Sequence, residues 1–429
     1  MDFQPVKGTR DFYPQEMALR NWLAEAWRRV SLRNGFVEFD GPVMEHLDLF
    51  RAKSGEEIVS ELFSFTDRGG RELALRPEIT PTLARMVNAR INSLPRPIKW
   101  FSIPRLFRAE NPQRGRLREF FQWNVDVIGS DDVFPDAECI FTCIDLLAEL
   151  GLRPEDAIIR IGSRPLTTAM LRKVGVGDDN MEAALAALDK RGRVTPEQFG
   201  KSMSELGLSG EATGELCRLQ DAKDPSDLLQ EGLDGAAGAV GDLLRLRELL
   251  ETMEAWRFCR FDFSVVRGLA YYTGIVYEVH DAAGRLRAVA GGGRYDNLLE
   301  VLGGPAVGAT GFGMGDAVLA ILLEQAGKLP DLAERLDCFV VTDTDDLLPS
   351  VLRLVGGLRR RGVRTDFAAR ARSLSKLLKE ANRRNARYAA IVMDTGRIGL
   401  KDLADKLEAS ESEDFHHADS RPTPTACPM

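Results

Sequence analysis

The stretch FRAENPQRGRLREFFQ, residues 107–122, sets four arginines and two glutamates between aromatic side chains. Asn111-Pro112 and Gly115 form turns, and apolar runs typical of strands lie on both sides of them. The stretch therefore predicts two strands joined by a long hairpin loop, with Arg114 and Arg116 at its tip.

Such a hairpin has two interpretations of equal weight. Arginine forks match phosphate oxygens and stay charged at any working pH. Glu110 can accept a hydrogen bond from an exocyclic amine, and Phe120 offers a ring on which a base can stack. A phosphate-bearing ligand would explain this set. The alternative is a surface hairpin whose charges pair with one another, and such pairs contribute little stability.

Outward from the hairpin, short apolar runs alternate with turns from residue 35 to about 130, and strand patterns return at 260–266, 275–280 and 286–293. We expect a mostly antiparallel sheet with helices at 15–34, 135–151 and 315–327. Residues 166–252 are charged, helical in pattern and poor in β-branched runs, which predicts an all-helical insertion. The expected core is therefore split into 1–165 and 253–330.

The last region, 335–408, alternates strands and helices as a small parallel α/β domain does. Residues 359–387 contain eleven arginines and lysines and only two acidic residues, although the whole chain has a net charge of −8. This one-signed excess favours contact with a polyanion over solvated helix faces. Residues 409–429 are polar and rich in proline, and we expect them to be a disordered tail.

The composition excludes several classes of protein. The sequence contains no run of about 18 apolar residues, which predicts no membrane span. Its beginning lacks the pattern of a signal peptide, and its six cysteines are scattered without CxxC pairs. A reduced cytoplasmic protein without dedicated metal ligands is the expectation.

Three further segments contain glycines beside polar or aromatic residues. In VVRGLAYYTGIVYEV, residues 265–279, strand alternation would send Tyr271 and Tyr272 to opposite faces, so only one can line a pocket. In AVAGGGRYDNLL, residues 288–299, a plain turn is favoured over close approach of a ligand. In GATGFGMGDAVL, residues 308–319, the glycines are expected to pack a strand against the following helix.

Together these segments resemble the class II aminoacyl-tRNA synthetases, and specifically the histidyl-tRNA synthetase family. The resemblance runs from KGTRDFYP (7–14) to about residue 400. It includes GFVEFDGPVME (35–45), LRPEITPTLAR (75–85), the hairpin, and the two signatures RGLAYYTG and GGGRYD. It implies an α+β fold, in which an antiparallel catalytic core flanked by helices carries a helical insertion (166–252) and a C-terminal anticodon-binding α/β domain (335–408). It also implies a homodimer formed through 35–45.

The resemblance further implies that the protein activates L-histidine with ATP and Mg²⁺ and transfers it to tRNA-His. Arg267 and Arg108 would be catalytic at the α-phosphate. The other implied roles fall into three groups: Arg108, Glu110, Arg116 and Phe120 for ATP; Glu78, Thr80, Gln122, Asp126, Tyr272 and Tyr295 for histidine; and Arg359, Arg360, Arg361, Arg383 and Arg384 for tRNA.

The sequence departs from the family pattern at the third motif. A Gly-x-Glu-Arg run usually supplies an arginine that packs on adenine, but here Asp316, Ala317 and Val318 follow Gly315. ATP must then be held differently, or the segment serves only packing. Two alternative functions remain open. One is the non-catalytic regulatory subunit of ATP phosphoribosyltransferase, which binds histidine as a signal, and the other is a different class II synthetase.

Overall fold

The computed structural model describes residues 3–54, 61–233, 235–267, 272–333, 335–394, 397–403 and 408–409. These residues fall into two compact units, 1–330 and 331–429, which are described separately below. Of the tail expected at 409–429, the described part of the chain includes only Ala409. In the described residues, no helix is both long enough and apolar enough to cross a membrane.

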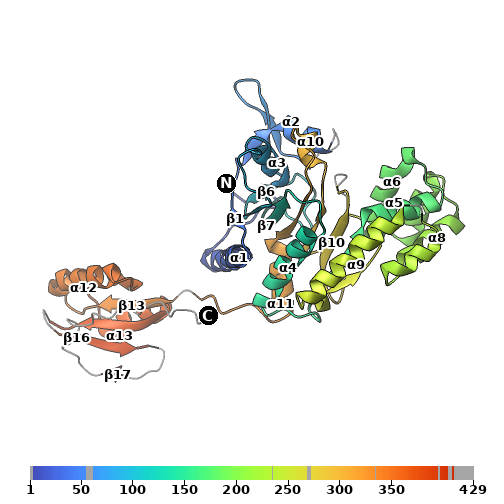
Figure 1. Ribbon diagram of the computed structural model, residues 1–429. Coiled ribbons are helices and arrows are strands. Elements are labelled where there is room, and N and C mark those ends of the chain that lie inside the picture. Colours follow the sequence, from blue (N-terminus) through green and yellow to red (C-terminus); the bar gives the residue numbers. More distant parts are fainter. Residues whose placement is uncertain are drawn as a thin grey trace. The chain divides into compact units, whose positions relative to one another are not determined.

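The first unit is built on a nine-stranded sheet with the order β1-β5-β7-β12-β11-β10-β8-β9, to which β6 adds by pairing with β7 (Figure 1). All its pairs are antiparallel except β1 with β5 and β8 with β9, which confirms the mostly antiparallel sheet. Its strands are β1 (Val37–Glu38), β5 (Ile98–Ser102), β6 (Arg105–Phe107), β7 (Glu119–Ile128), β8 (Ala157–Ser163), β9 (Cys259–Phe261), β10 (Ile275–Asp281), β11 (Ala290–Arg294) and β12 (Ala309–Gly315).

Two expected strands were too long. The pattern at 260–266 predicted a strand, but β9 ends at Phe261, and the chain then turns through 262–267. The pattern at 286–293 also predicted a strand, but β11 begins only at Ala290. In both cases irregular segments bury apolar side chains in the core. The sequence therefore shows the apolar pattern of a strand, although the backbone does not form the hydrogen bonds of one.

Helices pack on one face of this sheet to form the largest core. Trp27 of α1 (Pro14–Arg33) lies parallel to Trp123 of β7, with ring centroids 6.3 Å apart. Trp123 also meets Phe312 of β12 edge to face, and its indole nitrogen donates to Ser31 Oγ at 2.8 Å. The helices α4 (Phe134–Glu149) and α11 (Asp316–Gln325) contribute apolar side chains to the same cluster.

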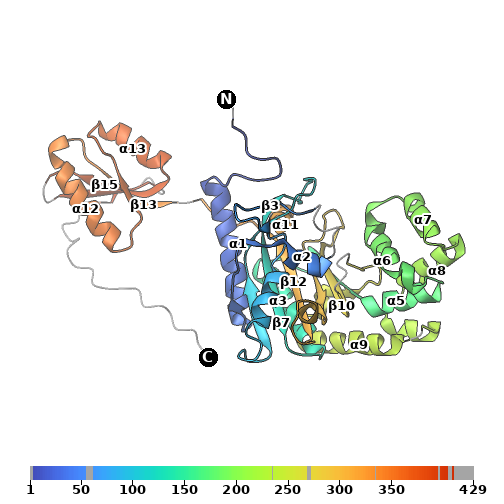
Figure 2. The same ribbon diagram turned by 90° about the horizontal axis from the view of Figure 1, so that it is seen from above.

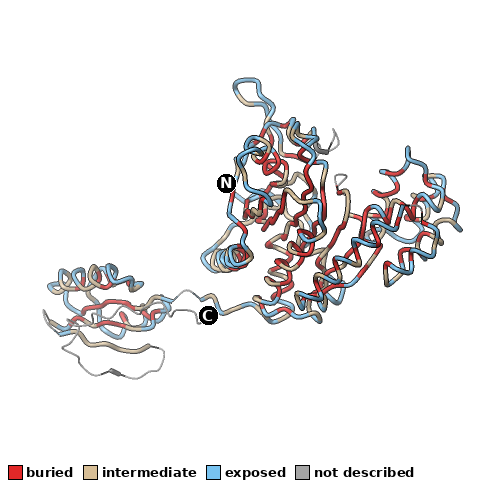
Figure 3. Tube along the Cα trace, viewed as in Figure 1, coloured by how far each residue is buried: buried red, intermediate tan, exposed pale blue. Residues whose placement is uncertain are grey.

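The opposite face is covered differently. A second apolar cluster joins α3 (Thr80–Asn88) and α10 (Leu298–Val301) to Ile98, Ile128 and Val276 of the sheet. A small three-stranded sheet stands beside it, with β2 (Met44–His46), β3 (Ser64–Thr66), β4 (Glu72–Leu75) and the helix α2 (Leu47–Ser54). Figure 3 shows the buried trace following the central strands.

Helices α5 to α9 gather to one side of the core and link β8 to β9 (Figure 2). They are α5 (Arg164–Lys173), α6 (Met181–Lys190), α7 (Pro196–Glu205), α8 (Gly210–Gln220) and α9 (Ala236–Thr252). The helix α7 starts at a capping box made by Thr195 and Gln198, a device that satisfies two backbone donors at once. This helical segment shares the largest apolar cluster with the sheet.

The second unit is a five-stranded sheet with the order β14-β13-β15-β16-β17. Its strands are β13 (Leu336–Val341), β14 (Thr365–Phe367), β15 (Ala386–Val392), β16 (Ile398–Asp402) and β17 (Glu408–Ala409), and its helices are α12 (Leu348–Arg360) and α13 (Leu374–Arg383). The first three strands are parallel, as expected. β16 and β17 add antiparallel strands to this sheet, which the sequence analysis did not predict.

Candidate active site

One face of the central sheet carries a strip of four glycines. Gly291 pairs with Gly313, and Gly293 pairs with Gly311, so the four lie together on the neighbouring strands β11 and β12. Because side chains alternate between the faces of a sheet, all four expose backbone on the same face. The intervening Phe312 points into the opposite core.

Each of these glycines makes room for a side chain from elsewhere. A Cβ atom at Gly291 would lie 1.9 Å from Arg267 Nη1, and one at Gly311 would lie 2.2 Å from Asp126 Oδ1. The same is true of two further pairs, in which Gln122 lies over Gly313 and Tyr272 lies over Gly293. The strip therefore assembles four of the predicted site residues in one place.

This arrangement corrects two sequence-based interpretations. The glycines of residues 288–299 were expected to form a turn, but Gly291 and Gly293 lie inside the strand β11. The glycines of 308–319 were expected to pack against the following helix, but Gly311 and Gly313 face away from α11, toward Asp126 and Gln122. Glycine occurs here because other side chains lie directly against the backbone of these strands, and not because the chain turns. We call this bare surface the floor of the site.

A buried polar pair lies at the end of the glycine strip formed by Gly293 and Gly311. Tyr295 donates its hydroxyl hydrogen to Asp126 Oδ1 at 2.5 Å, and both residues are almost fully buried. Tyr272 is buried beside them in the same apolar cluster as Tyr295. Tyr271, the neighbouring candidate, lies outside the described residues. The structure thus brings together Asp126, Tyr272 and Tyr295, all of which were predicted to bind histidine.

Arg267 lies at the other end of the glycine strip, over Gly291, and the carboxylate of Glu278 holds it there. Its backbone has a φ of 51°, in the left-handed region that non-glycine residues seldom adopt. Its Nη1 donates to Glu278 Oε1 at 2.8 Å, and Glu278 Oε2 also contacts His280 Nε2. Burial alone would raise the pKa of Glu278, but the bonds from His280 and Arg267 outweigh it and lower the pKa to about 2. Glu278 therefore stays ionised and keeps Arg267 in place.

The hairpin has the predicted shape, with Gln113 and Arg116 bridged across its turn. Arg108 lies over the ring of Phe120, 5.1 Å from its centroid. Arg116 forms an ion pair with Glu110, so two residues predicted to meet different parts of ATP contact each other here. Arg114 lies beside the turn glycine, Gly115.

Two other segments adjoin the hairpin. Arg108 Nε donates to the carbonyl oxygen of Pro77 at 3.2 Å, which holds the segment with Glu78 and Thr80 against the hairpin base. Both of these residues are half-buried on either side of the fully buried Ile79. In this way Glu78 and Thr80, which were predicted to bind histidine, lie beside Arg108, which was predicted to act at the α-phosphate.

The divergent third motif makes packing contacts. Asp316 accepts from Arg10 at 2.6 Å and from the backbone N–H of Phe121 at 3.1 Å. Val318 packs against the hairpin turn, since a Cβ atom at Gly115 would lie 3.0 Å from Val318 Cγ2. The place at which the family pattern has an arginine thus holds an apolar contact to the hairpin.

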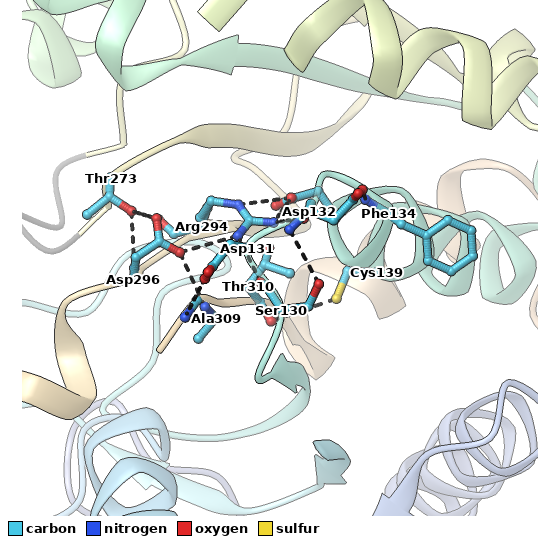
Figure 4. Close-up of polar contacts among 12 residues, drawn as sticks. Ser130, Asp131, Asp132, Phe134, Cys139, Thr273, Arg294, Asp296, Ala309 and Thr310 are labelled. Atoms are coloured by element: carbon cyan, nitrogen blue, oxygen red, sulfur yellow. Dashed lines mark hydrogen bonds and ion pairs between the residues drawn. The ribbon is translucent and has the colours of Figure 1, made fainter. Parts of the chain in front are cut away.

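Arg294, a residue not proposed from the sequence, is the centre of a buried polar network (Figure 4). Its side chain donates to Asp136, at the start of α4, and to the carbonyl oxygens of Ser130 and Asp132. Burial raises the pKa of Asp136 to about 6, although Arg294 acts to lower it. Alternation along β11 sends Arg294 to the α4 side and Tyr295 to the site. The charge of Arg294 inside an apolar strand was the signal in the sequence.

The five arginines predicted to bind tRNA are all exposed in the second unit. Arg359, Arg360 and Arg361 end α12 just before β14, while Arg383 and Arg384 end α13 just before β15. The helices lie on opposite faces of the sheet. Both end near the end of the sheet at which the parallel strands begin. A cavity of about 770 Å³ at this edge adds Arg364, Asn382, Asn385 and Arg387, which were absent from the predicted set.

These arginines also have structural roles. Cations at helix C-termini also stabilise the helix dipole, and Arg384 forms an ion pair with Asp366 at 2.8 Å. Among the described residues, no group of three or more His, Cys, Asp or Glu side chains could hold a metal ion.

Comparisons with known proteins agree on one family. The family model described as histidyl-tRNA synthetase matches residues 8–316. A histidine–tRNA ligase of Arabidopsis thaliana, described as chloroplastic/mitochondrial, is 39% identical over 408 residues, covering 94% of this chain and 84% of the relative. A histidine–tRNA ligase of Opitutus terrae is 38% identical and covers 95% of each chain.

Solved structures show the same fold at lower identity. A histidyl-tRNA synthetase from Nostoc sp. PCC 7120 superposes with a TM-score of 0.80 at 22% identity, covering 96% of this chain and 97% of that one. A Bacillus halodurans protein described as an ATP phosphoribosyltransferase regulatory subunit/histidyl-tRNA synthetase has a TM-score of 0.75, also at 22% identity, with 92% and 99% covered. Both names that the sequence analysis left open therefore occur in the descriptions of structures with this fold.

Proposed function

The chain belongs to the histidyl-tRNA synthetase family, and from that premise we propose which of its side chains carry out the reaction. The enzyme activates histidine with ATP and transfers it to tRNA. In the first step the histidine carboxylate attacks the α-phosphorus of ATP, pyrophosphate leaves, and histidyl-adenylate remains. The terminal ribose hydroxyl of tRNA then attacks the adenylate carbonyl carbon and releases AMP.

The buried bond between Tyr295 and Asp126 is the observation that carries the assignment of the amino-acid pocket. A carboxylate at the bottom of a closed pocket can accept a hydrogen bond from an imidazole N–H. An amino acid without such a donor would leave this buried acceptor poorly satisfied, which is a strong basis for rejection. Tyr272 and Gln122 would line the sides, and Glu78 and Thr80 would receive the ammonium group.

The phosphate end would be served by Arg267 and Arg108. Negative charge grows on the equatorial oxygens of the α-phosphate during an in-line displacement, so fixed cations lower the barrier more than acid–base groups would. Arg267 is fixed by Glu278, and Arg108 is fixed between Phe120 and the carbonyl oxygen of Pro77. Both guanidinium groups are thus oriented before substrate arrives.

The hairpin would hold the rest of ATP. Phe120 would stack on adenine, Glu110 would accept from the adenine amine, and Arg116 would reach the outer phosphates. These last two roles require the ion pair between Arg116 and Glu110 to open when ATP binds. Mg²⁺ prefers oxygen ligands and commonly binds through substrate phosphates, where it would neutralise charge; we propose that ATP supplies most of its ligands.

The first test is histidine-dependent exchange of pyrophosphate into ATP. We expect exchange with histidine alone among the amino acids, and Arg267→Ala should reduce its rate on the order of 10²–10³-fold because a fixed cation at the α-phosphate is lost. Arg260→Ala is the matched control, since Arg260 is exposed on β9 and should exchange at the wild-type rate. Wild-type protein that binds histidine but catalyses no exchange would contradict the proposal and indicate a histidine-sensing protein.

We propose that the second unit binds tRNA through the arginines at the end of its sheet where the parallel strands begin. Replacing Arg360 and Arg383 with glutamate should raise the KM for tRNA about tenfold or more and make charging less dependent on salt. Pyrophosphate exchange should not change, because it requires no tRNA. Arg353→Glu, seven residues earlier in α12, is the control. Equal effects of both variants on charging would argue against a localised tRNA site.

A homodimer through residues 35–45 is proposed on two observations. β1 is the last strand on its side of the sheet, and apolar side chains are exposed near it, with exposed fractions of 60% for Val37 and 51% for Met44. An unpaired edge beside apolar side chains favours association. Sedimentation equilibrium at micromolar concentration should give twice the chain mass, and a single chain mass would contradict the proposal.

A further inference from the structure

Thr273 and Asp296 connect the two signature segments of the sequence directly. Thr273 Oγ1 donates to Asp296 Oδ2 at 2.7 Å, and the backbone N–H of Asp296 donates back to Thr273 Oγ1 at 3.1 Å. The backbone N–H of Thr273 also donates to the carbonyl oxygen of Arg294 at 2.8 Å. Thr273 Oγ1 also contacts the carbonyl oxygen of Arg294 at 3.4 Å. Residues 272–274 and 294–296 are therefore joined by four hydrogen bonds within a few residues (Figure 4).

The side chain of Arg294 extends this connection to a third segment. Its Nη1 donates to the carbonyl oxygen of Ser130 at 3.2 Å, two residues beyond the end of β7. Its Nε donates to Asp136 Oδ2 at 3.0 Å. Arg294 is only 8% exposed and Asp136 is fully buried. The end of β7, the start of α4 and the end of β11 are thus held by one guanidinium group.

Gly274 makes room for the side chain of Arg294. A Cβ atom there would lie 2.9 Å from Cδ of Arg294 and 3.1 Å from its Cβ. A side chain at 274 would therefore displace the stem of Arg294. This explains in physical terms why a threonine and a glycine follow Tyr272, and why an arginine and an aspartate flank Tyr295.

The three connected segments share one property, which is that each carries a residue proposed to face the imidazole. Asp126 lies on β7, Tyr272 directly precedes Thr273, and Tyr295 lies between Arg294 and Asp296. None of the connecting side chains belongs to the proposed ligand contacts. Their bonds fix the spacing between the three that do.

We infer that Thr273, Arg294 and Asp296 are positioning residues, and that they set histidine affinity by fixing Tyr272 and Tyr295 against Asp126. This inference rests on the proposed function of the pocket. A bond as short as the one between Tyr295 and Asp126 tolerates little displacement, so loosening either tyrosine segment should weaken histidine binding. The ATP residues of the hairpin, and Arg267 at the proposed α-phosphate site, are not joined to this network by any of its bonds described above, so ATP binding should be spared.

The test compares Thr273→Val with Thr273→Ser. Valine has nearly the shape of threonine but lacks the hydroxyl, whereas serine keeps it. In pyrophosphate exchange, Thr273→Val should raise the KM for histidine by roughly fivefold to tenfold, as expected for the loss of a half-buried hydrogen bond, while the KM for ATP changes less than twofold. Thr273→Ser should restore the wild-type histidine KM.

Thr142→Val is a control for lost stability. Thr142 Oγ1 donates to the carbonyl oxygen of Glu138 within α4, so this variant loses a comparable bond away from the three segments and should keep both KM values. If Thr273→Val fails to fold, Asp296→Ala removes the same bond from the other side, together with the contacts of Asp296 Oδ1 to Arg294 Nη1 and to the backbone N–H of Ala309, and it should raise the histidine KM at least as much.

Three results would overturn the inference: equal rises in both KM values, no rise in either, or a serine variant that behaves like the valine variant. Failure of the inference is distinguishable from failure of the proposed function. Wild-type protein without histidine-dependent exchange would contradict the function itself, whereas normal exchange with an unchanged histidine KM in Thr273→Val contradicts only the positioning role.

Discussion

The glycine strip on β11 and β12 is the constraint on which the rest of the site depends. A sheet normally covers its own backbone with side chains on both faces. Here Gly291 and Gly311 leave the backbone bare, so Arg267 and Asp126 can lie against it at distances that any Cβ atom would prevent. The proposed histidine pocket and the proposed α-phosphate site thus lie at two ends of the same glycine strip, and the register of the strands sets their separation.

The opposite face makes this arrangement stable. A floor without side chains contributes little apolar burial, so the sheet must gain it on its other side. Trp123 and Phe312 alternate with the site residues and pack with Trp27 of α1 in the largest core. Arg294 and Tyr295 are divided in the same way, since Arg294 anchors β11 to Asp136 of α4 while the next residue, Tyr295, is bonded to Asp126 on the face of the proposed site. Function and stability are therefore divided between successive residues of the same strands.

Much of this could be predicted from the sequence, because local patterns carried it. The hairpin, the mostly antiparallel core and the basic C-terminal region followed from turn formers, alternation and charge. The family resemblance supplied the roles of Arg108, Arg267 and Asp126, which no spacing along the chain could reveal.

What escaped prediction depends on contacts between distant segments. Glycines in a row are read as a turn unless the side chains above them are known, and nothing local in the sequence places Arg267 over Gly291. Asp136 lies 158 residues from its partner Arg294, so their pairing has no local signal. Strand β16 escaped because its pairing partner, and not its composition, makes it a strand. The packing of Val318 on the hairpin turn likewise appeared only in three dimensions.

The most direct measurement of the central claim is pyrophosphate exchange by Gly291→Ala beside Gly315→Ala. The added methyl group at 291 would meet the guanidinium group at the end of the Arg267 side chain and no backbone atom among its nearest contacts. The fold should therefore survive with a melting temperature within a few degrees of the wild type, while exchange falls on the order of 10²-fold or more because the cation is displaced. The Gly315 variant, where a Cβ atom meets nothing within 4 Å, should exchange normally. Wild-type exchange by a folded Gly291→Ala protein would contradict the claim that the bare floor positions Arg267.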